Sequence, residues 1–151
     1  MTTNNVKMKT LVERMNLKNL TPDIDYAGKE VVIPDINRPA LPLTGFFENF
    51  DSRRVQIIGY AEYSYLETLD DERKKVIYEE FLKEDMPCII FCRSLKPDEI
   101  LIEKAVKANV PLFSTDIHTS EFTAEIIRWL NVALAPCISI HGVLVEAYGV
   151  G

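Results

Sequence analysis

Apolar residues recur at helical spacing in five segments of this chain. A repeat of three or four residues is typical of an amphipathic helix, because it gathers the apolar side chains on one face. The clearest case is residues 70–83, where Ile77/Phe81 and Tyr78/Leu82 stand four positions apart behind acidic residues that favour a helix start. The predicted helices span residues 6–15, 60–69, 70–83, 97–108 and 119–134.

Short β-favouring runs alternate with these helices. The run at residues 88–92 is apolar at every position, which is typical of a strand covered on both faces. The predicted strands span residues 30–33, 55–58, 88–92, 110–113, 138–140 and 143–145. Because strands and helices alternate, we expect an α/β fold with a mostly parallel sheet and flanking helices.

Prolines interrupt the pattern between the first two strands. Residues 34–45 contain Pro34, Pro39 and Pro42. Proline removes a backbone donor and restricts the backbone, so this segment is predicted to be a stiff loop, neither a helix nor a central strand. Pro97 is predicted to occupy the first position of the fourth helix, where its missing N–H is not needed.

Composition narrows the class of protein. A length of 151 residues suits one domain, or one domain with a short appendage, and 47% hydrophobic residues suffice for a core. A net charge of −6 argues against nucleic-acid and anionic-membrane partners. No segment approaches the ~20 apolar residues that span a bilayer, and the first residues lack the features of a secretion signal. We expect a soluble cytoplasmic protein.

The three cysteines are an odd number, which argues against a disulfide framework. Cys88 and Cys92 would lie roughly 13 Å apart on the predicted strand. That distance is too long for a disulfide or for two ligands of one zinc ion. We therefore expect ordinary, mostly buried thiols and no metal site.

Three side chains are candidates for chemistry. His141 is the strongest, because histidine titrates near neutrality and can move protons or bind a phosphate oxygen; the alternative is a strand-end histidine that only bonds to its neighbours. Arg38 could clamp a carboxylate or phosphate, or could pair with Asp35 or cap nearby backbone. Arg93 follows the strand at residues 88–92, where ligands gather in parallel sheets, and is either an anion ligand or a solvated side chain.

Three segments carry a resemblance to a known family. They read Pro-Asp-Ile-Asn-Arg-Pro-Ala-Leu-Pro-Leu-Thr-Gly-Phe at 34–46, Pro-Cys-Ile-Ile-Phe-Cys-Arg-Ser-Leu-Lys-Pro at 87–97 and His-Gly-Val-Leu-Val-Glu-Ala-Tyr-Gly at 141–149. In this order they resemble segments of the bacterial HPr kinase/phosphorylases, and the likeness extends over the whole chain.

The resemblance implies a fold similar to the amino-terminal domain of the Mur ligases. It also implies that residues 1–135 form the amino-terminal domain and that 136–151 begin a carboxy-terminal domain, whose Gly-x-x-x-x-Gly-Lys-Ser phosphate loop is absent here. We therefore expect no cofactor-binding residues and no metal ligands in this chain. The family's matching histidine has an active-site role, so His141 is expected to act only beside that second domain.

The activity implied is that of a bifunctional enzyme of carbon catabolite control. The parent enzyme phosphorylates a serine of HPr, a carrier of the phosphotransferase system, with ATP or pyrophosphate and magnesium, and removes the phosphate by phosphorolysis. Family members are hexamers, and the 151-residue chain alone is predicted to be inactive. The alternative is a non-catalytic regulatory, small-anion-binding or assembly module; a distinct small enzyme that only shares the fold is least favoured.

Overall fold

The computed structural model describes residues 2–3, 5–48 and 50–137 of the chain. Its centre is a five-stranded sheet with the strand order β3-β8-β7-β6-β5. The strands are β3 (Lys18–Asn19), β5 (Ile36–Asn37), β6 (Val55–Ile58), β7 (Ile89–Phe91) and β8 (Leu112–Ser114). Strands β5 to β8 run parallel, and β3 pairs antiparallel with β8. The predicted α/β class with a mostly parallel sheet is confirmed, whereas the likeness to Mur ligases stays a prediction.

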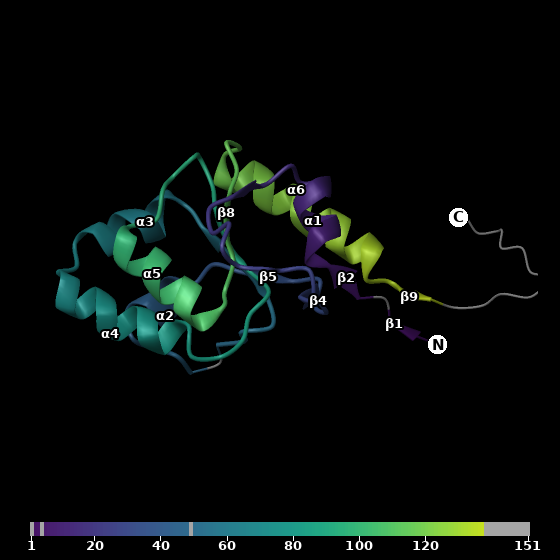
Figure 1. Cartoon of the computed structure of the whole chain (residues 1–151). Helices are drawn as coiled ribbons and strands as arrows, with labels where there is room; N and C mark the ends of the chain where they lie inside the picture. Colours follow the sequence, from purple (N-terminus) through teal and green to yellow (C-terminus); the bar gives the residue numbers. More distant parts are fainter. Residues whose placement is uncertain (1, 4, 49, 138–151) are drawn as a thin grey trace, which may run out of the picture.

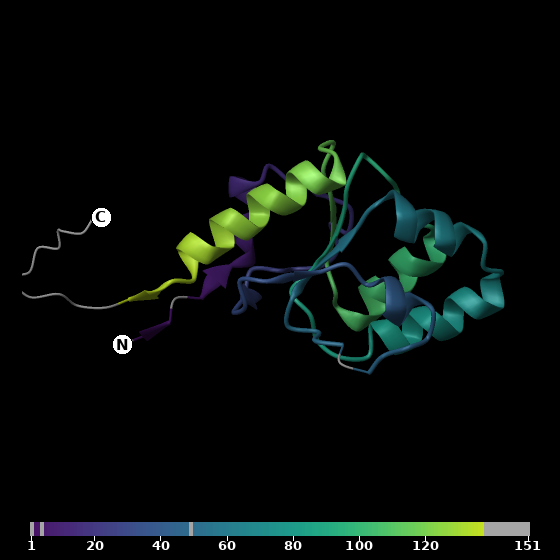
Figure 2. The ribbon, with the colours of Figure 1, turned by 180° about the vertical axis from the view of Figure 1, so that it is seen from behind.

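Helices cover both faces of the sheet (Figure 1, Figure 2). On one face lie α1 (Met8–Arg14) and α6 (Thr119–Ala133); on the other lie α2 (Ala40–Leu43), α3 (Tyr60–Glu67), α4 (Asp71–Phe81) and α5 (Glu99–Ala108). Successive strand residues alternate between the two layers, so that Ile57 and Ile90 face α1 and α6, whereas Ile58 and Ile89 face α2 to α5. Both faces of the sheet are therefore buried, as the apolar run at 88–92 predicts.

Aspartate side chains fix the starts of α4 and α5. Asp70 accepts a hydrogen bond from the Arg73 N–H at 2.8 Å, and Asp98 accepts one from the Leu101 N–H at 2.8 Å. Since Asp98 is the N-cap residue of α5, Pro97 lies one residue outside the helix. The prediction that Pro97 occupies the first helical position is wrong, because the aspartate side chain is the stronger start signal.

The proline-rich segment at 34–45 holds more regular structure than predicted. It contains β5, at the edge of the sheet, and α2, which has Pro39 at its N-cap and Pro42 in its only turn. The first turn of a helix has no intrahelical acceptor for its N–H groups, so Pro42 does not break α2. The prediction that no helix forms here is wrong, while β5 is an edge strand rather than a central one, as expected near prolines.

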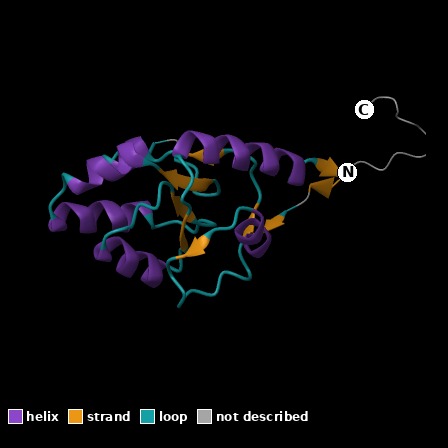
Figure 3. Cartoon of the chain, turned by 90° about the horizontal axis from the view of Figure 1, so that it is seen from above, coloured by secondary structure: helices purple, strands orange, loops and turns teal. Residues whose placement is uncertain are grey.

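Two short antiparallel pairs lie outside the sheet. Strand β2 (Val6–Lys7) pairs with β4 (Glu30–Val31), and β1 (Thr2–Thr3) pairs with β9 (Pro136–Cys137) beyond the carboxyl end of α6 (Figure 3). The helix predicted from residue 6 therefore begins at Met8. The predicted strands at 138–140 and 143–145, like His141, lie outside the described residues.

Candidate functional site

The carboxyl ends of the four parallel strands meet at one edge of the sheet, and this edge collects most of the candidate side chains. Arg38 follows β5, Gly59 follows β6, Arg93 closely follows β7 and Asp116 closely follows β8. Helices α3 and α6 also begin here. In parallel α/β sheets this is the edge at which ligands bind.

Arg38 is held by a buried glutamate. Its Nη2 donates to Glu62 Oε1 at 2.7 Å, and the Glu62 side chain is 5% exposed, against 36% for Arg38. The same Glu62 oxygen accepts the Gly59 N–H at 2.8 Å. One carboxylate thus joins the segment after β5, the segment after β6 and the first turn of α3. The partner of Arg38 is therefore Glu62 rather than the Asp35 considered from the sequence.

Gly59 is the residue at which Arg38 and the start of α6 lie close to the backbone after β6. A Cβ atom added at Gly59 would lie 2.6 Å from Thr119 Oγ1 and 2.8 Å from Arg38 Nη2. These distances are shorter than van der Waals contacts allow. The absence of a side chain at Gly59 therefore lets the start of α6 approach the ion pair at the start of α3.

Cys92 lies fully buried beside this cluster, at the end of β7. Burial raises the pKa of its thiol to about 11, although the Thr119 hydroxyl and the charge of Arg38 oppose the rise. Burial raises the pKa of Cys88 as well. A thiol that stays protonated at neutral pH is a poor nucleophile. The prediction of ordinary buried thiols is confirmed for Cys88 and Cys92.

The loop after β7 closes the space between β7 and β8. Arg93 and Ser94 both have left-handed backbone, with φ of 60° and 57°. Their N–H groups donate to the carbonyls of Ile117 at 3.0 Å and Thr115 at 2.9 Å, and the Ser94 hydroxyl donates to Asp116. Because α5 and α6 leave these two strands for opposite faces, a crevice would be expected here. The three hydrogen bonds bridge it.

Both candidate arginines contact the first turn of α3. The Arg93 guanidinium lies 5.9 Å from the centre of the Tyr60 ring, and Arg38 bonds to Glu62 two residues further on. A contact of this kind stabilises the position of an exposed arginine by about 0.5–1 kcal/mol. The structure thus brings Arg38 and Arg93 to the same helix start, each with a partner that the sequence did not indicate.

A hollow lined by Arg38, by residues of α2 and by the segment after α2 lies at this helix; we call it the α2 hollow. It has a volume of about 440 Å³. Its lining includes Asn37, Arg38, Leu41, Phe46, Glu48 and Phe50. The combination of apolar walls with a few charged groups is typical of small-molecule sites.

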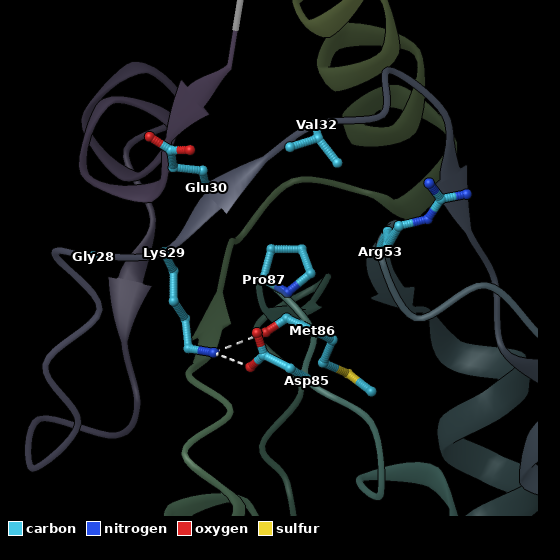
Figure 4. A pocket seen from close by; sticks show the side chains of 8 residues that line it. All are labelled: Gly28, Lys29, Glu30, Val32, Arg53, Asp85, Met86 and Pro87. Atoms are coloured by element: carbon cyan, nitrogen blue, oxygen red, sulfur yellow. Dashed lines mark hydrogen bonds and ion pairs between the residues drawn. The ribbon is translucent and has the colours of Figure 1, made fainter.

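A second hollow, of about 290 Å³, lies at the opposite, amino-terminal edge of the sheet (Figure 4). Lys29 Nζ donates to Asp85 Oδ1 at 2.7 Å and to the Met86 carbonyl at 3.2 Å. The Arg53 guanidinium points away from this pair and bonds to Asp51 (Figure 4). The Lys29–Asp85 ion pair links the segment before β4 to the segment before β7, and it leaves neither of these two charges without a partner.

Two features often used to assign function are not found in the described part of the chain. No group of three histidine, cysteine, aspartate or glutamate side chains there could hold a metal ion. None of its helices combines the length and apolar character needed to cross a bilayer.

Comparison with known proteins identifies one family. The family described as HPr Serine kinase N terminus matches residues 6–130. The chain belongs to this family. The HPr kinase/phosphorylase of Lachnoclostridium phytofermentans is 51% identical over 146 residues, and that of Clostridium tetani is 38% identical over the same length. In both cases the match covers 97% of this chain and 47% of the relative, so the chain spans about half the length of the curated relatives it matches.

A solved structure also matches this chain. It contains the CBS and DRTGG domains of the regulatory region of Clostridium perfringens pyrophosphatase, complexed with the activator diadenosine tetraphosphate. The match has a TM-score of 0.49 and 13% sequence identity, and it covers 89% of this chain and 53% of that chain.

The family was predicted correctly from three short segments, but three residues at the carboxyl ends of the parallel strands were not predicted. Glu62, Gly59 and Thr119 lie outside those segments. A signal for the first two was present: a glycine followed three residues later by glutamate, directly before a helical pattern, is a variant of the capping box. Thr119 offered no comparable signal, because its role depends on how α6 packs against the end of β6.

Proposed function

We propose that this chain serves as the amino-terminal domain of a bifunctional HPr kinase/phosphorylase. The parent enzyme would phosphorylate a serine of HPr with ATP or pyrophosphate and magnesium. It would also remove the phosphate from that serine by phosphorolysis. The supporting observation is the 51% identity, over 97% of this chain, to a protein that carries that name. The proposal includes a cytoplasmic location and a homo-oligomeric parent, for which the family's hexamer is the precedent.

The chain itself is proposed to be non-catalytic. Phosphoryl transfer relies on loop amides, a lysine and a metal ion that stabilise the transferred group. The 151-residue sequence contains no Gly-x-x-x-x-Gly-Lys-Ser segment. We therefore assign ATP and magnesium binding to the part of the relatives that this chain does not span, with the boundary between the two domains near residues 135 and 136.

His141 is the one catalytic residue that we propose within this sequence. The support is its place in the His-Gly-Val-Leu-Val segment, since the residue lies outside the described structure. In the gene's full-length product, His141→Ala should lower both kinase and phosphorylase rates by a hundredfold or more, on the order of what a general acid or base contributes. Circular dichroism would verify that the variant folds. Unchanged rates in both directions would remove His141 from the active site.

The direct test uses HPr, ATP and magnesium with two samples, the 151-residue chain and the gene's full-length product. Intact-mass measurement of HPr should show added phosphate with the full-length product and none with the chain alone. Phosphoserine formed by the chain alone would refute its proposed inactivity. No phosphoserine with a folded full-length product would refute the kinase proposal itself.

The second candidate is a non-catalytic regulatory or assembly module. The observation that favours it is the α2 hollow, an open site with charged and apolar walls that lies in a domain without phosphate-binding motifs. The assay of the full-length product separates the two candidates. Phosphoserine on HPr supports the kinase proposal, whereas a free-standing non-catalytic module predicts none.

A further inference from the structure

The α2 hollow offers two kinds of wall. One is apolar and exposed: Leu41 is 61% exposed and Phe46 is 49% exposed, and both residues line the hollow together with Phe50. Large apolar side chains that stay exposed around a concavity mark a binding surface. This wall favours a ligand with an apolar side chain or ring.

The other wall holds charges of opposite sign. Arg38 and Glu48 both line the hollow. Arg38 is oriented in advance, because Glu62 accepts a hydrogen bond from its Nη2 while 36% of its side chain stays exposed. Its Nε is buried, so it is not one of the donors that a ligand in the hollow could reach. A guanidinium has five N–H donors, so donors remain for a ligand carboxylate.

The negative charge of Glu48 disfavours ligands that carry only negative charge. A free phosphate or a simple carboxylate would meet Arg38, but it would also face the like charge of Glu48, in a chain whose net charge is −6. Because Arg38 already pairs with Glu62, a ligand carboxylate would share the guanidinium with Glu62, and a ligand ammonium would meet Glu48. A ligand with one negative and one positive group therefore leaves the charge balance of the hollow unchanged. A cationic group would also be attracted to the faces of nearby aromatic rings.

We propose that the α2 hollow binds a free α-amino acid with an apolar side chain, with the carboxylate at Arg38, the ammonium at Glu48 and the side chain against Leu41 and Phe46. The site goes beyond the kinase function proposed above and does not depend on it. It would make the domain a sensor of a zwitterionic metabolite.

The test measures binding directly, on the ¹⁵N-labelled 151-residue chain. L-phenylalanine should shift the amide signals of residues 37–48 in a saturable way, with a Kd of about 1 mM. Three analogues each remove one contact: 3-phenylpropionate lacks the ammonium, phenethylamine lacks the carboxylate and glycine lacks the side chain. Each should bind about tenfold more weakly, as expected when one charged or apolar contact is lost.

Variants locate the site. Glu48→Gln should reduce L-phenylalanine affinity about tenfold without reducing that of 3-phenylpropionate, since only the former carries an ammonium. Leu41→Ser should weaken both. Val132→Ser is the matched control, because Val132 is 74% exposed on α6, on the other face of the sheet.

Three results would overturn the proposal. These are no saturable shift with L-phenylalanine, shifts that centre on Lys29 rather than on the α2 hollow, or equal binding of 3-phenylpropionate and L-phenylalanine. None of them bears on whether the full-length product phosphorylates HPr, so this proposal and the kinase proposal fail separately.

Discussion

At the scale of single residues, Gly59 shows how tightly the carboxyl-end edge is built. Gly59→Ala should lower the free energy of unfolding by about 1–3 kcal/mol, because the new methyl group would displace Thr119 or Arg38. Urea unfolding followed by circular dichroism measures this. Gly28→Ala is the control: nothing lies within 4 Å of its added Cβ, so its effect should stay within about 0.5 kcal/mol. Equal effects of the two changes would contradict the close packing at Gly59.

The buried thiols predict a fall in stability at alkaline pH. In the folded state the pKa of Cys92 is about 11, against an ordinary value of 9.0. Between these pH values the folded state binds more protons than the unfolded state, so the free energy of unfolding decreases as pH rises from 9 to 11. The slope contributed by Cys92 should be at most about 1.4 kcal/mol per pH unit.

Urea unfolding between pH 8 and pH 11 tests this prediction. Cys92→Ala should reduce the slope without abolishing it, because the pKa of Cys88 is raised by burial too. A free energy of unfolding that stays constant from pH 9 to pH 11 would show that the thiols are accessible to water.

The residues of the candidate site were only partly predictable from the sequence. The sequence indicates Arg38 as a candidate because a stiff loop carries it, and Arg93 because it follows a strand. The sequence could not indicate that Arg38 pairs with Glu62, or that Arg93 lies over the Tyr60 ring. Both contacts form between segments that only the fold brings together. Charge type is visible in a sequence, whereas the pairing of charges depends on tertiary structure.

At the scale of elements, α4 and α5 allow a matched comparison of helix caps. Asp70 caps α4 through one backbone N–H. Asp98 caps α5 in the same way, but it also accepts a hydrogen bond from the hydroxyl of the buried Tyr78 at 2.6 Å, and Lys74 lies 3.5 Å away. Asp70→Ala should cost about 1 kcal/mol. Asp98→Ala should cost about 2–3 kcal/mol, because it also leaves the Tyr78 hydroxyl buried without an acceptor.

Chemical denaturation of the two variants distinguishes a cap from a tertiary link. Tyr78→Phe supplies the third measurement: in that background, the difference between the two aspartate substitutions should shrink. If Asp98→Ala costs no more than Asp70→Ala, the bond from Tyr78 to Asp98 adds no stability.

The long amphipathic helices and the apolar central strands were predicted well, and most of the two-residue strands were not. Residues 70–83 and 119–134 correspond to α4 and α6 because amphipathic spacing reports which face packs against the sheet. The two-residue strands β1, β3, β5 and β9 carry too few positions for any period to emerge. They exist because a neighbouring strand offers hydrogen-bond partners, which is information held by the fold rather than by the segment.

At the scale of the whole molecule, two cores share one sheet. Residues of β6, β7 and β8 contribute to both cores, so neither helix layer can lose its contacts without exposing the sheet. We therefore expect a single unfolding transition. The only tryptophan, Trp129, packs against the core on the α1/α6 side and reports on that layer. Its fluorescence and the far-ultraviolet circular dichroism, to which both layers contribute, should give the same urea midpoint. Two separate midpoints would mean that the layers unfold independently.

The fold class followed from the sequence because alternating strands and helices leave few other arrangements. The assignment of helices to faces did not follow, since the helical patterns state only that one side of each helix is apolar. That assignment depends on the direction of each connection. The three connections within the parallel strands place α2 to α5 on one face, and the segment after β8 places α6 on the other.

This arrangement has a consequence for the order of assembly during protein synthesis. Residues 36–114 hold the four parallel strands and one helix layer, and they can pair locally as soon as they are made. The opposite layer joins Met8 and Leu11 to Phe122 and Ile126, so it cannot close until translation has passed α6. Until then α1 alone is available to cover the sheet face that carries Val55, Ile57 and Ile90, and the area that α6 packs against stays exposed. That face is where a nascent chain of this protein would be most exposed to aggregation or to chaperone binding.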